Sequence, residues 1–120
     1  MEKEFVTYEQ ALALKELGFK EDCLASYYHA GKRLGIGEYI NHGNYTILAP
    51  LKQQVFRWFR EKYGWIGGIR QLSQSGNGMI IGEFRKDEDN NFMMFAESYE
   101  QCENYCIENL IKIINPQGNG

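Results

Sequence analysis

The chain has 120 residues, of which 43% are hydrophobic and 24% charged, proportions that are typical of an ordinary globular protein. Its formal net charge of −3 excludes a general attraction to phosphate backbones or anionic lipids. The three cysteines have no framework spacing, which indicates free thiols in a reducing compartment, and no stretch approaches the roughly 20 apolar residues of a membrane span. The N-terminal residues are charged and resemble no signal peptide.

The first predicted element is a helix over about residues 8–17. Thr7 and Gln10 have the spacing of a capping box, in which each side chain accepts a hydrogen bond from the other residue's backbone N–H. Apolar residues then recur at helical spacing until Gly18, which ends the helix.

A β-hairpin is expected next. Segments 23–28 and 34–40 are short and rich in aromatic and β-branched residues, and residues 29–33 supply the turn between them. A loop over residues 41–44 and the segment 45–48 then lead into a second helix.

The stretch from Ala49 to Gly64 has the clearest pattern in the chain. Pro50 suits the first position of a helix, and Gly64 suits the left-handed residue just past its end. Large apolar side chains occupy an arc of roughly 160° on one side. They are Leu51, Val55, Phe56, Trp58, Phe59 and Tyr63. A face this wide needs covering by a sheet.

The second half predicts three strands and a last helix. The strands and the turns between them are expected at residues 69–74, 75–78, 79–85, 86–91 and 92–96, with a bend at 65–68 opening the first strand. Ser98 and Gln101 form a second capping box, and the helix that follows runs over residues 99–114 until Pro116 stops it.

The order α-β-β-α-β-β-β-α, with the strands in neighbouring hairpins, predicts an α+β fold with a single antiparallel sheet and helices packed on one face. We expect one domain over residues 1–115 and a frayed tail over residues 116–120. From the second helix to the last, the order of elements resembles the double-stranded RNA-binding domain. The lysine-rich start of that family's second helix is replaced here by the acidic segment 98–103.

No residue pattern indicates catalysis or cofactor binding. Cys102 and Cys106 lie one turn apart on an apolar stripe, which favours small buried hydrophobes over zinc ligands or a disulfide. Cys23 and His42 lack the neighbours of a nucleophilic pair, and the glycine-rich segments lack the order of a phosphate loop. The sequence therefore predicts no catalytic residue, no metal site, no cofactor and a protein that is not an enzyme.

Candidate binding residues lie on the second helix and just after it. They are Phe56, Arg57, Trp58, Arg60, Tyr63 and Trp65. If either tryptophan is exposed, the aromatic side chains would form a contact surface for a protein partner or a second copy. Arg57 and Arg60 could instead grip an anion, so a weak nucleic-acid or anion-binding module that uses basic residues of this helix is the alternative.

Five segments of the sequence resemble a group of small proteins of unknown function from phages and from prophage-like regions of bacteria, Bacteroidetes among them. The segments are Thr7–Phe19, Ala49–Pro50, Phe56–Gly64, Ser98–Gln101 and Leu110–Ile113, of which Phe56–Gly64 is the most specific. The resemblance implies a cytoplasmic bacterial or phage protein and assigns no chemistry. We therefore expect a small non-enzymatic protein that acts by contact with another protein or with itself, with nucleic acid an unlikely partner and no membrane contact.

Overall fold

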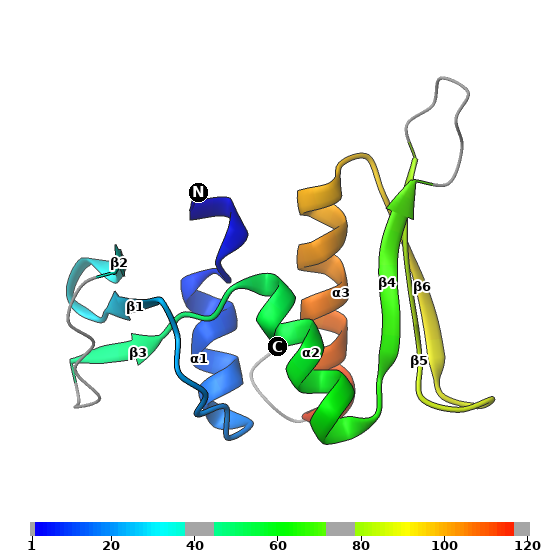
Figure 1. Ribbon diagram of the computed structural model, residues 1–120, viewed down its shortest axis with the longest axis horizontal. Helices are drawn as coiled ribbons and strands as arrows, with labels where there is room; N and C mark the ends of the chain where they lie inside the picture. Colours follow the sequence, from blue (N-terminus) through cyan, green and yellow to red (C-terminus); the bar gives the residue numbers. More distant parts are fainter. Residues whose placement is uncertain (1, 38–44, 72–78, 117–120) are drawn as a thin grey trace. The chain divides into compact units, whose positions relative to one another are not determined.

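A computed structural model describes residues 2–37, 45–71 and 79–116 (Figure 1). Its elements, in chain order, are η1 (Glu2–Glu4), α1 (Tyr8–Glu16), β1 (Ala25–Tyr28), η2 (Ala30–Lys32), β2 (Arg33–Ile36), β3 (Thr46–Leu48), α2 (Lys52–Tyr63), β4 (Ile66–Gln71), β5 (Ile80–Arg85), β6 (Asn91–Ala96) and α3 (Tyr99–Ile114), where η marks a 3-10 helix. The chain divides into two compact units, one of Met1–Val55 with Ile111–Gly120 and one of Phe56–Leu110. The expectation of one domain over residues 1–115 stays a prediction.

The start of α1 confirms the first capping box. Gln10 N donates to Thr7 Oγ1 at 3.1 Å, and Thr7 N donates to Gln10 Oε1 at 2.9 Å. These two bonds satisfy backbone N–H groups that have no partner within the helix. Gly18 follows the last turn with φ 94°, the left-handed conformation that ends many helices.

The sheet of the first unit has the strand order β2-β1-β3, and both pairings are antiparallel. The predicted hairpin of β1 and β2 is confirmed, with η2 and the left-handed Gly31 in its turn. The strand β3 was missed, because the sequence pattern gave residues 45–48 no partner. The predicted loop over residues 41–44 lies outside the described residues.

The segment before α2 is tied to the N-terminus of the chain. Leu51 forms an antiparallel β-bridge with Phe5, and Val6 N donates to the carbonyl of Pro50 at 3.1 Å. The hydroxyl of Tyr27 donates to the carbonyl of Val6 at 2.7 Å. This pairing holds the chain extended up to Leu51, so the prediction of Pro50 as the first helical residue is wrong. The prediction for the other end is confirmed, since Gly64 has φ 79°.

The sheet of the second unit has the strand order β4-β5-β6 and is antiparallel throughout. The strand β4 begins at Ile66, three residues earlier than predicted, and so includes two glycines. A Cβ at Gly67 would overlap the carbonyl oxygen of Glu83 and would lie 2.7 Å from the Cα of Phe84. The close approach of two backbones therefore explains a glycine within the strand. The predicted turn over residues 75–78 lies outside the described residues.

Within this unit, the parts of α2 and α3 that belong to it lie on one side of the sheet (Figure 1). On β5, Gly82 and Phe84 point to that side, because alternate residues of a strand share a face. The ring of Phe56 on α2 stacks on Phe84 with 5.2 Å between centroids. A Cβ at Gly82 would overlap the sulfur of Cys106 on α3. Both helices therefore contact the central strand.

The predicted α+β class is confirmed, whereas the single sheet and the order of elements are wrong. The described residues form two three-stranded antiparallel sheets. The structure differs from the predicted single sheet because β3 pairs with the free edge of β1 and completes the first sheet before α2 begins.

Candidate functional site

The two tryptophans among the predicted binding residues are buried. Trp58 is 6% exposed and packs edge-on against Phe59 and Tyr63, with centroids 5.1 and 5.5 Å away. Trp65 is 3% exposed and contacts Phe92 at 5.7 Å. The condition for a contact surface built on either tryptophan is not met.

The remaining predicted residues divide between core and surface. Phe56 and Tyr63 are half-buried in the aromatic packing, while Arg57 and Arg60 are exposed on α2. The structure therefore does not gather the six residues into one patch. An anion-binding role for the two arginines stays a prediction.

A different surface emerges on the side of the second sheet that α2 and α3 leave uncovered. Since Gly82 and Phe84 point toward the helices, their neighbours on β5 point away. The cross-strand partners complete three rows of three positions: Arg70, Ile81 and Phe95; Gly68, Glu83 and Met93; Ile66, Arg85 and Asn91. We call these nine positions the open sheet face.

Large apolar side chains are exposed on the open sheet face. Ile66 is 64% exposed, Met93 55% and Phe95 51%. Ile81 on the central strand is buried. Single exposed apolar residues are ordinary, but several on one face of a sheet are typical of an interaction surface.

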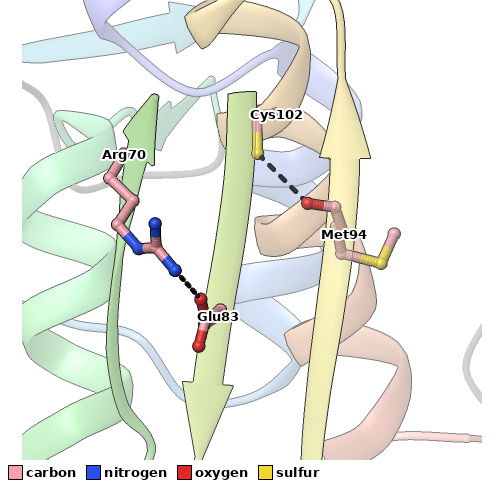
Figure 2. A network of polar contacts seen from close by, with 4 residues as sticks. All are labelled: Arg70, Glu83, Met94 and Cys102. Carbon is pink, nitrogen blue, oxygen red and sulfur yellow. Dashed lines mark hydrogen bonds and ion pairs between the residues drawn. The ribbon is translucent and has the colours of Figure 1, made fainter. Parts of the chain in front are cut away.

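The same face carries an ion pair and a further cation. Arg70 Nη2 of β4 lies 2.6 Å from Glu83 Oε1 of β5, and Figure 2 shows the two side chains reaching toward each other. Both side chains are largely exposed, so water screens the pair and it stabilises the fold by at most about 1 kcal/mol. With Arg85, the face has two arginines and one glutamate, a net charge of +1 on a chain of net charge −3.

A shallow hollow of about 730 Å³ lies over part of the open sheet face. Its lining includes all six residues of the second and third rows. Gly68 contributes no side chain, and a Cβ added there would meet nothing within 4 Å. The missing side chain leaves room at this position for a group from outside.

The cysteines are poor nucleophiles. Burial raises the pKa of Cys106 to about 12, and burial with the nearby Glu21 and Asp22 raises the pKa of Cys23 to about 12. Thiols with such pKa values stay protonated and unreactive at neutral pH. Cys102 is fully buried, and its Sγ donates to the carbonyl of Met94 at 3.8 Å (Figure 2).

Over the described ranges, no three or more His, Cys, Asp or Glu residues are grouped so that they could hold a metal ion. Within the same ranges, no helix combines the length and the apolar character needed to span a membrane.

The sequence pattern did not single out Ile66, Met93 or Phe95. The available signal was the apolar run of β6, because a strand that is apolar on both faces needs cover on both sides. The helices cover one side of this sheet, which leaves the other apolar face open. Comparisons with protein-family models, with curated proteins and with solved structures find no significant match to this chain.

Proposed function

We propose that the protein acts by protein–protein contact, without catalysing a reaction, and that the open sheet face is its contact surface. The observation that supports this proposal is the exposure of Ile66, Met93 and Phe95 on one face of a regular sheet. Because the sequence resembles a group of phage and prophage proteins, we propose further that this is a phage-type or prophage-type protein of the bacterial cytoplasm.

The energy available from this face is moderate. Full burial of an exposed Ile, Met or Phe contributes about 1.5–3 kcal/mol, and these three side chains are already roughly half covered, so each has about 1 kcal/mol left to gain. The total of about 3 kcal/mol is below the cost of association. A partner must therefore add polar contacts, and the charged side chains of the second and third rows are placed to make them.

Hydroxyl-radical footprinting tests whether this face is a contact surface. We expect Ile66, Met93 and Phe95 to be modified in dilute purified protein and protected in concentrated protein or in an extract of cells that encode it. Leu24 and Tyr45, which are exposed in the first unit, serve as controls whose modification stays constant. Equal modification of the three face residues under every condition contradicts the proposal.

A further inference from the structure

We infer that the partner on the open sheet face is a second copy of this chain, packed face to face about a two-fold axis that runs across the strands between Glu83 and Arg85. This inference rests on the proposed function. It follows from the charges and the shape of the face, both of which are self-complementary about that axis.

The charges on the central strand are arranged for self-pairing. Glu83 and Arg85 are two residues apart on β5, so they share a face and lie about 7 Å apart along the strand. A two-fold axis midway between them exchanges the second and third rows. Glu83 of each copy then faces Arg85 of the other, and the two pairs are equivalent, as an isologous interface requires.

The shapes of the β4 column match about the same axis, while the first row lies beyond the two exchanged rows. In the β4 column, the exchange of rows places Ile66 of one copy opposite Gly68 of the other. Ile66 is the most exposed apolar residue of the face, and the position of Gly68 has open space above it. In the β6 column the exchange places Met93 opposite Asn91. The hollow spans these two rows, so its location coincides with the inferred axis.

The charges also disfavour two other symmetric arrangements. An axis across the strands through the second row would place Glu83 against its own copy. An axis along β5 would place Glu83 against Glu83 and Arg85 against Arg85. Like charges in direct opposition disfavour association. The axis between the two rows pairs opposite charges instead.

The ion pair within each copy is compatible with this arrangement. Arg70 contacts Oε1 of Glu83, and an ionised carboxylate accepts hydrogen bonds at both oxygens. Glu83 can therefore accept from Arg70 of its own chain and from Arg85 of the other copy.

The dimer is expected to be weak. Strands of six residues span about 20 Å and three strands about 14 Å, so each face has a footprint of only about 280 Å², smaller than that of a standard specific interface. We expect a dissociation constant in the range of about 1 µM to 1 mM.

Sedimentation velocity of two charge variants tests the inference. Glu83→Lys sets a lysine against Arg85 of the other copy, and Arg85→Glu sets a second glutamate against Glu83. Each variant alone therefore opposes like charges and is expected to remain near 14.0 kDa. In an equimolar mixture every facing pair becomes opposite in charge. We expect the mixture to form a species of twice that mass, with an affinity at least about tenfold higher than either variant alone.

A second pair of variants tests the shape. Gly68→Phe fills the space that Ile66 of the other copy would occupy, and its Cβ would meet no atom of the described residues within 4 Å. We expect this variant to be a folded monomer, with the fluorescence of the buried Trp65 unchanged. Leu24→Ser, which removes an exposed apolar side chain of the first unit, is the matched control and is expected to dimerise like the parent chain.

The inference is overturned if the parent chain stays monomeric up to about 1 mM, the weak limit of the expected range. It is also overturned if the mixed variants associate no better than each alone. A monomer whose face is still protected in the cell extract would show a different protein as the partner, and the proposed function would then stand without the second copy. A monomer with no protection in any footprint contradicts both.

Discussion

The contact between β5 and α3 leads to a quantitative prediction for Gly82→Ala. The added Cβ would overlap the sulfur of Cys106 and lie 3.1 Å from the sulfur of Cys102 and 3.6 Å from Cγ1 of Ile69. Ordinary van der Waals contacts are about 3.5–4.0 Å long, so the sulfurs must rotate within the packed core or the helix and the strand must separate. The helix and the strand are held by regular hydrogen bonds, and both sulfurs are fully buried, so either change is costly. We expect a loss of about 2–3 kcal/mol, the upper part of the range for overpacked cores.

The sulfur of Cys106 allows a rescue experiment. Cys106→Ala alone removes a small buried group and should cost about 1 kcal/mol. In the double variant, the methyl group introduced by Gly82→Ala occupies the space that the sulfur leaves. The double variant is therefore expected to be more stable than Gly82→Ala alone, with a coupling of about 1–2 kcal/mol between the two positions.

Urea denaturation measures these differences, with the buried Trp58 and Trp65 as fluorescent probes. Gly82→Ala should also lower the thermal midpoint by about 8–12 °C. Gly68→Ala is the matched control, because its Cβ meets nothing within 4 Å. Two results refute the reasoning: a Gly82→Ala variant as stable as the parent, or losses from the two substitutions that add to within about 0.5 kcal/mol.

Three further predictions concern the stability of the fold. Gly67→Ala should lower the free energy of unfolding, measured by urea denaturation, by more than about 2 kcal/mol, because its Cβ meets the backbone of the neighbouring strand. Gly68→Ala should be neutral or slightly stabilising, and equal effects of the two substitutions contradict this interpretation. Thr7→Ala removes the cap of α1 and should cost about 1 kcal/mol, with Thr7→Ser retaining most of the stability. Stability should fall as the pH rises from 9.0 toward about 12, because the unfolded thiols ionise near their ordinary pKa of 9.0 while burial holds the pKa of Cys23 and Cys106 at about 12. Stability curves against pH check this, and Cys23→Ala should make the decline shallower.

The sequence predicted the elements whose signals are local. The capping box of α1, the left-handed Gly64 after α2 and the span of α3 each depend on residues within a few positions of one another. Such interactions form within one segment, so the pattern of that segment is sufficient to locate them.

The division into two sheets was not predictable in the same way. The strand β3 has three residues, too few for a clear alternation of apolar and polar side chains. Its partner in the sheet is β1, from which β2 separates it in the sequence. The wide aromatic face of α2 predicted burial but not which side chains would cover it.

The candidate site was missed because exposure is a tertiary property. The apolar run of β6 predicted a strand, and nothing local distinguishes a face that a helix covers from one that stays open. The large number of aromatic residues on α2 indicated a contact surface there instead, but some of these side chains, among them Trp58, are buried in the core.

The small residues at the contact of α3 with β5 also limit how the helix can shift along its axis. On a flat apolar sheet, a helix could slide by one turn, about 5.4 Å, and bury a similar area. Here the two sulfurs of Cys102 and Cys106 sit over the notch at Gly82. A shift by one turn would bring Leu110 to the place of Cys106, and the bulkier side chain would not fit. The missing side chain at Gly82 thus disfavours a slip in this direction.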